Sequence, residues 1–211
     1  MKIRNRMPQN RPPAGERGSA LIEFLLCMTL LIVPLLLGTT VLGLNLIREI
    51  QVTEVCRDAT HMYSQGVDFT ETSYQTELFK IAQGLNISAS GGNGVIILST
   101  ITYIDSNACT AGGYTNSNCT NLNQNVFTRQ VVIGNSSLRA SAFGTPPVDT
   151  TNSDNVTQAN YLTNATARAN FSIIPLSAGQ YAYVGETYFT TPDLSWWGPL
   201  GTTGISARFV F

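Results

Sequence analysis

Charged residues and histidine are scarce in this chain of 211 residues. Lysine, arginine, aspartate and glutamate make up 12% of the sequence, which is low for a soluble domain, and His61 is the single histidine. A Ser-His-Asp hydrolase would have to use His61, which falls in a segment expected to be helical. The P-loop, GxGxxG and HExxH patterns are lacking. The prediction is therefore a protein that is not an enzyme and has no cofactor.

The sequence also lacks the patterns that are typical of metal-binding and nucleic-acid-binding sites. The four cysteines form no CxxC pair and no cluster with histidine, so no metal site is expected. Residues 1–18 hold five of the 12 basic residues and one of the 13 acidic residues, which leaves residues 19–211 with a formal side-chain charge of −5. The basic residues of that remainder are scattered and form no stripe. This argues against nucleic acid as a partner.

One long hydrophobic run is present near the N-terminus. Residues 24–47 contain no formally charged side chain, and a helix of that length spans about 36 Å, enough to cross a bilayer. The run is preceded by a basic segment, whereas the charges of Arg48 and Glu49 after it cancel each other. By the positive-inside rule the N-terminus stays cytoplasmic and residues from Arg48 onward are exported. We expect a single-pass membrane protein with an exported C-terminal domain.

A carboxylate lies at the start of this run. Glu23 follows Gly18 by five positions in the sequence Gly-Ser-Ala-Leu-Ile-Glu-Phe. A charged side chain in or near hydrocarbon costs roughly 2 to 3 kcal/mol or more, so such residues usually have a partner and a function. Hydropathy alone is equally compatible with a plain, uncleaved signal anchor. The position of Glu23 relative to Gly18 is the feature that such an anchor leaves unexplained.

The basic leader, Gly18, Ser19 and Glu23 together resemble the type IV prepilin signal. The resemblance implies that a membrane-embedded prepilin peptidase cuts between Gly18 and Ser19 and removes the leader. Glu23 would then lie one helical turn from the new terminal ammonium group of Ser19. Because residues four apart share a helix face, the carboxylate could pair with the ammonium group of its own chain or of a neighbouring subunit during assembly.

Two further stretches make the resemblance more specific. PLLLG at 34–38 and ETYFTTP at 186–192 are most similar to the TadE-like minor pilins (pseudopilins) of the tight-adherence (Tad/Flp) pilus. This implies a structural subunit in the bacterial inner membrane that takes part in assembly, or lies at the tip or base, of a fibre used in surface adhesion. Its implied partners are the peptidase, other pilins, the assembly machinery, and membrane lipid before assembly. The chain departs from the family in two ways. Its proline lies farther from Glu23 than is usual, and Gly43-Leu44-Asn45 stands where an acidic residue is usual.

Apolar residues continue at helical spacing after the hydrophobic run, which predicts one helix from Ser19 to about Ser64 with Gly66 ending it. A second helix is expected over about 70–85. The expected domains are a cleaved leader at 1–18, a transmembrane half of the helix at 19–47, an exported half at 48–66 and an exported globular domain at 67–211.

The rest of the chain predicts strands joined by polar loops. Runs rich in Val, Ile, Thr and Tyr predict strands at 94–104, 126–133, 165–176, 181–190 and 203–211. The Asn-, Ser- and Gly-rich stretches 105–125 and 135–164 are expected to be loops. Strands that follow a long helix predict an α+β fold, an antiparallel sheet with the helix on one face.

The cysteines are expected to be of different kinds. Cys109 and Cys119 lie in one polar loop of the exported part, where oxidising conditions favour a disulfide between them. Cys27, in the hydrophobic run, is interpreted as a small apolar residue. Cys56 is interpreted as an inert thiol on a helix face, with a bond to another chain as the alternative.

Two features leave other functions open. The pair Trp196 and Trp197 could contact a carbohydrate or a partner, or simply cap a sheet edge. Six Asn-x-Ser/Thr sequons are compatible with a eukaryotic type II membrane glycoprotein, which would not explain the spacing of Gly18 and Glu23. The main alternative to a pilin-like subunit is a single-pass anchor that displays a binding or sensory domain.

Overall fold

The computed structural model describes residues 16–89, 91–147, 161–190 and 204–211. The chain divides into two compact units, Met1–Gly43 and Leu44–Phe211, and each is described by itself. Most of the expected leader, much of the loop expected at 135–164, and both Trp196 and Trp197 lie outside the described residues.

Helix α1 (Glu16–Ser64) confirms the long helix predicted from the sequence. It begins before Ser19 and contains Pro34 without a break in the helical assignment. Thr29 donates its hydroxyl hydrogen to the Leu25 carbonyl at 2.8 Å, which satisfies a polar group within an apolar helix. Among the described residues this is the one helix that is long and apolar enough to cross a membrane, judged by length and composition.

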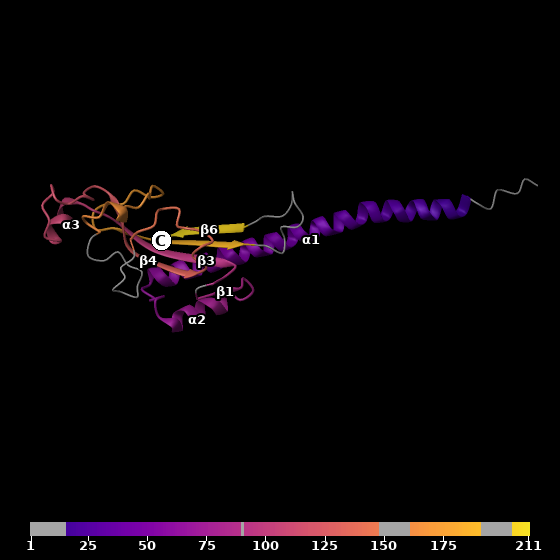
Figure 1. The fold of residues 1–211 in the computed structure, drawn as a ribbon, viewed down its shortest axis with the longest axis horizontal. Helices are drawn as coiled ribbons and strands as arrows, with labels where there is room; N and C mark the ends of the chain where they lie inside the picture. Colours follow the sequence, from indigo (N-terminus) through magenta and orange to yellow (C-terminus); the bar gives the residue numbers. More distant parts are fainter. Residues whose placement is uncertain (1–15, 90, 148–160, 191–203) are drawn as a thin grey trace, which may run out of the picture. The chain divides into compact units, whose positions relative to one another are not determined.

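The second unit is built around a four-stranded antiparallel sheet with the strand order β4-β3-β5-β6 (Figure 1). The strands are β3 (Gly94–Tyr103), β4 (Asn125–Gly134), β5 (Tyr181–Thr190) and β6 (Gly204–Val210). The central strand β3 is buried along almost its whole length, which explains its continuous run of β-branched residues.

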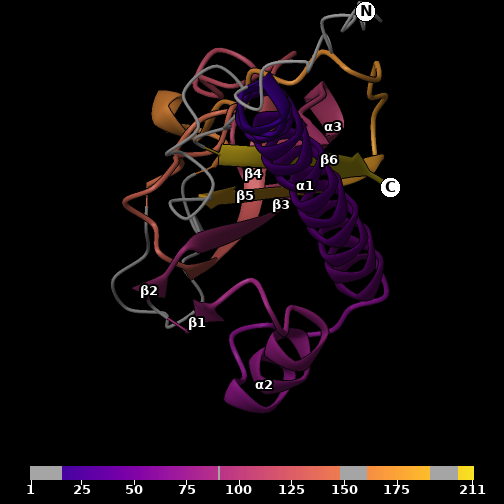
Figure 2. The ribbon, with the colours of Figure 1, turned by 90° about the vertical axis from the view of Figure 1, so that its right-hand side faces the viewer.

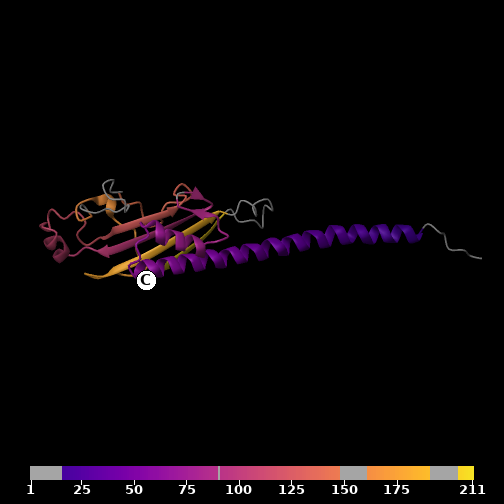
Figure 3. The ribbon, with the colours of Figure 1, turned by 90° about the horizontal axis from the view of Figure 1, so that it is seen from below.

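The part of α1 that belongs to this unit packs on one face of the sheet, here called the helix face. Figure 3 shows its last turns running beside the strands. Val52, Val55, Ala59 and Tyr63 are buried there in one apolar cluster. They recur at spacings of three and four, so they form a stripe on one side of the helix. The predicted α+β arrangement, a sheet with the long helix on one face, is confirmed.

Smaller elements complete the helix face. Helix α2 (Thr72–Ile81) contributes the fully buried Leu78 to the same cluster. The short strands β1 (Ile87–Ser88) and β2 (Gly91–Gly92) pair with each other, and Figure 2 shows them next to α2. The predicted second helix is therefore present but ends earlier, at Ile81, and the chain then turns at Gly84, which has a φ of +100°.

The opposite face of the sheet, here called the loop face, is covered by irregular chain. Phe143 and Phe171 pack with Phe127 of β4 and Val184 of β5 in a second apolar cluster. A third cluster lies around helix α3 (Ser106–Ala111) and includes Cys109, Cys119 and Val126. The expected loop at 105–125 therefore contains a short helix.

One predicted strand is wrong. Residues 165–176 form a single 3-10 turn, η1 (Ala165–Ala167), followed by irregular chain and not by a strand. The Asn164 side chain accepts a hydrogen bond from the Thr166 amide at 3.0 Å and starts this turn. Of the following apolar residues, Phe171 is buried on the loop face with Ala169 and Leu176 packed against the same cluster, whereas Ile173 and Ile174 are about half exposed.

Candidate functional site

Gly18, Ser19 and Glu23 all lie within α1, in the first unit. Ser19 and Glu23 are four residues apart in a helix and therefore share one face. Glu23 is exposed and forms no ion pair or hydrogen bond with a described residue. Its neighbours Leu21 and Ile22 are 68% and 69% exposed. Residues 18–26 therefore present an apolar surface in which Glu23 is the one carboxylate, and such a surface suits contact with lipid or with another protein.

In the second unit, α1 approaches strand β5 closely at Gly185. A Cβ atom on Gly185 would lie 1.7 Å from Thr60 Oγ1, so only glycine fits between this strand and the helix. Thr60 is fully buried and donates its hydroxyl hydrogen to the Cys56 carbonyl. The Cys56 thiol donates to the Gly185 carbonyl at 3.4 Å. Strand and helix are thus held together by close packing and by the hydrogen bond from the Cys56 thiol to the Gly185 carbonyl.

Burial also determines the reactivity of the Cys56 thiol. Desolvation raises the pKa of this thiol, although hydrogen bonds with Thr187 and Thr60 act in the opposite direction. A buried thiol with a raised pKa is a poor nucleophile, because the thiolate is the reactive form. This supports the interpretation of Cys56 as an inert thiol, while Cys27 is exposed on the apolar part of α1.

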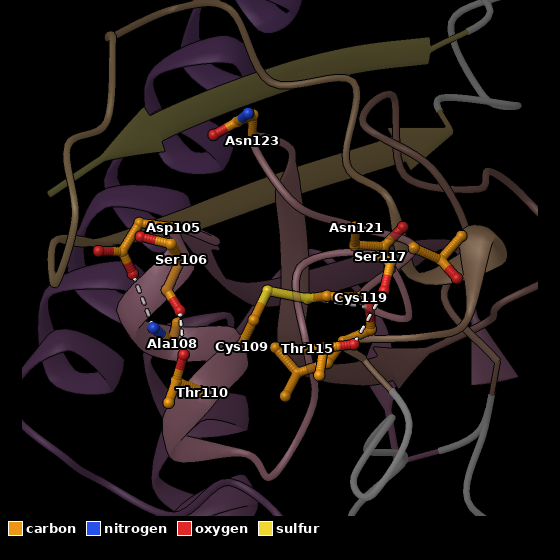
Figure 4. The surroundings of a disulfide bond; sticks show 12 residues. Asp105, Ser106, Ala108, Cys109, Thr110, Thr115, Ser117, Cys119, Asn121 and Asn123 are labelled. Atoms are coloured by element: carbon orange, nitrogen blue, oxygen red, sulfur yellow. Dashed lines mark hydrogen bonds between the residues drawn. A yellow bond between two sulfur atoms is a disulfide. The ribbon is translucent and has the colours of Figure 1, made fainter.

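The predicted disulfide between Cys109 and Cys119 is present (Figure 4). Cys109 lies on α3, which begins where the Asp105 side chain accepts a hydrogen bond from the Ala108 amide at 2.8 Å. Cys119 lies in the loop that follows, and both cysteines are buried. Leu162, from a distant part of the chain, packs against them. The bond therefore fixes a small lobe and does not present a reactive group.

A polar network lies where α1 ends. Arg129 of β4 forms an ion pair with Asp68 and lies over the Tyr63 ring, with its guanidinium carbon 6.0 Å from the ring centroid. Thr100 of β3 donates its hydroxyl hydrogen to the Tyr63 hydroxyl oxygen at 2.9 Å. Burial raises the pKa of Tyr63 to about 12, so its phenol stays protonated at neutral pH.

The Asp68 carboxylate is the acidic member of this network. Burial raises the pKa of Asp68, but hydrogen bonds from Thr70 and the charge of Arg129 outweigh burial, so its pKa lies below the ordinary value. The pair is therefore fully charged at neutral pH and its net charge is zero. Arg129 Nε is buried and has no hydrogen-bond partner among the described residues.

This network borders a cavity of about 290 Å³ on the helix face, here called the tyrosine pocket. It is lined by Tyr63, Thr100, Thr128, Arg129, Tyr181 and Tyr183. Gly66 forms part of its rim. With a φ of +87°, Gly66 turns the chain away at the end of α1, and the helix does not cover the sheet beyond this point. No local pattern in the sequence predicts this pocket, because its residues come from α1 and from separate strands that the fold brings together.

A second cavity, of about 280 Å³, lies on the loop face. Glu186 on its wall accepts hydrogen bonds from Arg208 Nη2 at 3.0 Å and from the Ala142 amide at 3.2 Å. Its carboxylate is thus used to hold strand β6 and the covering loop in place. Arg139 lies with its guanidinium carbon 5.3 Å from the Tyr188 ring centroid and forms no ion pair with a described residue.

Catalytic and metal-binding arrangements are not found in the described part of the chain. His61 is exposed on α1, where its ring lies 5.6 Å from that of Phe211 and 3.3 Å from the side-chain nitrogen of Gln65. Among the described residues its imidazole ring has no carboxylate or hydroxyl group as a hydrogen-bond partner. Among residues 16–89, 91–147, 161–190 and 204–211, no group of three or more His, Cys, Asp or Glu side chains could hold a metal ion.

Comparison of the chain with protein-family models, with curated proteins and with solved structures finds no match. The function has to be argued from the geometry of the chain itself.

Proposed function

We propose that this chain is a prepilin-like structural subunit of a Tad-type pilus, a minor pilin or pseudopilin that contributes to assembly or to the tip or base of a fibre used in bacterial surface adhesion. In this proposal it is inserted once in the inner membrane, with a cytoplasmic N-terminus and an exported C-terminal domain. A prepilin peptidase cuts it between Gly18 and Ser19, and it can then enter the extracellular fibre.

The observation that carries the proposal is the position of Glu23 in α1. The carboxylate is four residues from Ser19 on one helix face, at the start of a helix that is long and apolar enough to cross a membrane. It has no partner among the described residues. Cleavage before Ser19 would create an ammonium group one turn away and so supply the partner that a carboxylate in this environment requires.

The exposed apolar side chains around Glu23 support the same proposal. Leu25 and Leu26 are 66% and 60% exposed, like their neighbours. This surface suits lipid before assembly and the apolar helices of other pilins afterwards. The same helix continues to Ser64 and forms one layer of the second unit, so the membrane segment and the domain share one element.

The test is the amino-terminal sequence of the mature protein. The full chain is coexpressed with a prepilin peptidase, purified from membranes, and sequenced from its N-terminus. The expected result is a chain shortened by 18 residues that begins at Ser19. In parallel, Gly18→Ala should still be cut, whereas Gly18→Phe should not. Recovery of only the full-length chain beside an active peptidase, shown to process a known prepilin in the same cells, would refute the proposal.

A single-pass anchor that displays a binding domain is the second candidate, and the tyrosine pocket favours it. That function needs the membrane helix but neither the cleavage nor the carboxylate. The same sequencing experiment separates the two, because the anchor keeps residues 1–18.

A further inference from the structure

The helix face of the sheet extends beyond the end of α1. Tyr181 pairs with Thr102 and Tyr183 pairs with Thr100 across β3 and β5, which places these four side chains on the same face. Tyr63 reaches this face from the last turn of α1, and its ring meets that of Tyr183 edge-on at 5.9 Å. Tyr181, at the outer end, is 57% exposed. Three tyrosines thus form the wall of a pocket that neither helix nor loop covers among the described residues.

The pocket contains two hydroxyl groups that make no hydrogen bond with a described residue, those of Tyr181 and Tyr183. A hydroxyl group both donates and accepts hydrogen bonds, so a ligand that carries hydroxyl groups can pair with both of them.

The charge of the pocket favours a neutral ligand. Arg129 is the one cationic side chain that lines it, and its charge is already paired with Asp68. Asp68 is held in turn by the Thr70 amide at 3.1 Å and by the Thr70 hydroxyl at 2.8 Å. An anion would have to compete with this carboxylate for Arg129, and a cation would meet the guanidinium group. A purely apolar ligand would leave the hydroxyls of Tyr181 and Tyr183 without partners.

From these observations we propose that the tyrosine pocket binds a neutral saccharide. A pyranose ring has an apolar C–H face, which stacks on an aromatic ring, and hydroxyl groups around its edge, which accept and donate hydrogen bonds. The exposed Tyr181 ring supplies the stacking surface. The hydroxyls of Tyr63 and Tyr183 supply the polar contacts. The Tyr63 hydroxyl oxygen accepts its bond from Thr100, so its own hydrogen can be donated to the ligand.

The size of the pocket limits the ligand. Its volume of about 290 Å³ lies at the lower end of small-molecule sites, which run from roughly 300 to 1,000 Å³. The pocket therefore accommodates a single sugar residue, either free or at the end of a glycan. This inference goes beyond the proposed pilus function and does not depend on it, because binding is measured on the full chain in detergent without a fibre.

The test is saturation-transfer difference NMR on the full chain in detergent micelles. The probes are the methyl glycosides of glucose, galactose, mannose and N-acetylglucosamine, with methyl glucuronide as the charged counterpart of the glucoside. At least one neutral glycoside should give a specific signal that exceeds the signal of the glucuronide. Absence of signal from all four neutral glycosides, or a preference for the glucuronide, would overturn the proposal.

Variants locate the binding in the pocket. Tyr181→Ala removes the stacking surface from an exposed position, so the fold should be kept while binding weakens by about tenfold. Tyr181→Phe keeps the ring and should bind nearly as well as the wild type. Tyr74→Ala, at an exposed tyrosine of α2 outside the pocket, is the matched control and should bind like the wild type. Equal binding by Tyr181→Ala and the wild type would also overturn the proposal.

Discussion

Gly185 on strand β5 lies against Thr60 on helix α1, so close that a Cβ atom on the glycine would be 1.7 Å from the threonine hydroxyl oxygen. The glycine has no positive φ to explain it, and space is therefore the reason for its presence. The contact allows the helix to approach the sheet and bury Cys56 between them.

The first prediction concerns this contact. Gly185→Ala should destabilise the second unit by about 1–3 kcal/mol, because Thr60 must move within a close-packed interface. Thermal unfolding of the full chain in detergent, followed by near-ultraviolet circular dichroism, measures the change. Adding Thr60→Ala should recover part of the lost stability, because it removes the hydroxyl and methyl groups that clash with the new Cβ atom. Gly43→Ala, where nothing lies within 4 Å of the new Cβ atom, is the control and should not destabilise the chain.

A second prediction concerns the disulfide between Cys109 and Cys119. Changing both residues to serine should lower stability by about 2 to 3 kcal/mol in the loop-entropy model, because the closed loop is short. Membrane insertion should be unaffected, since the lobe around α3 is remote in sequence from the hydrophobic run. Non-reducing peptide mapping should find the two cysteines joined in exported protein. Free thiols at both positions after export would contradict this prediction.

The third prediction tests the charge of Glu23. Glu23→Gln keeps the size of the side chain but removes the charge that would pair with the Ser19 ammonium group after cleavage. Insertion and cleavage should persist, because an amide costs less than a carboxylate in hydrocarbon and the glycine is unchanged. Crosslinking to other pilins and recovery in sheared fibres should fall well below wild type at equal membrane levels. Incorporation equal to wild type would show that the carboxylate is not an assembly contact.

A fourth prediction concerns acid stability. The pKa of Asp68 is lower in the folded chain than its ordinary value of 3.8, so this carboxylate stabilises the fold above that pH. The contribution is lost as the pH falls below 3.8 and through the folded pKa. Asp68→Asn should therefore destabilise the chain at neutral pH, and the difference from wild type should shrink on acidification. Glu77→Gln removes an ion pair with Lys80 in which both side chains are exposed, and should change stability little at any pH.

Much of the fold could be predicted from local patterns. The α1 stripe at Val52, Val55 and Ala59 repeats at helical spacing, and β3 is a run of β-branched residues, so each element is specified by its own sequence. The run at 165–176 has similar composition but is not a strand. Its Phe171 side chain is buried on the loop face, and composition does not distinguish a strand from an irregular segment that buries an apolar side chain.

The candidate sites also differ in whether they could be predicted from the sequence. Gly18, Ser19 and Glu23 are close in sequence and could be singled out by their spacing, and the disulfide partners share one loop. The tyrosine pocket joins Tyr63 of α1, Arg129 of β4 and Tyr181 of β5. Only the strand register places these residues together, and pairing between distant strands is not encoded in any short stretch.

The burial of Cys56 between α1 and β5 controls how fast its thiol can be chemically labelled. A thiol reagent cannot reach this sulfur while the helix lies on the sheet, because the side chain is fully buried. It becomes reactive only when α1 lifts away from β5, so the rate of labelling reports how often that interface opens. Cys109 and Cys119 are blocked by their own bond. With Cys27 replaced by alanine, the chain would carry a single reporter of its own local opening, at the point where helix and sheet are closest.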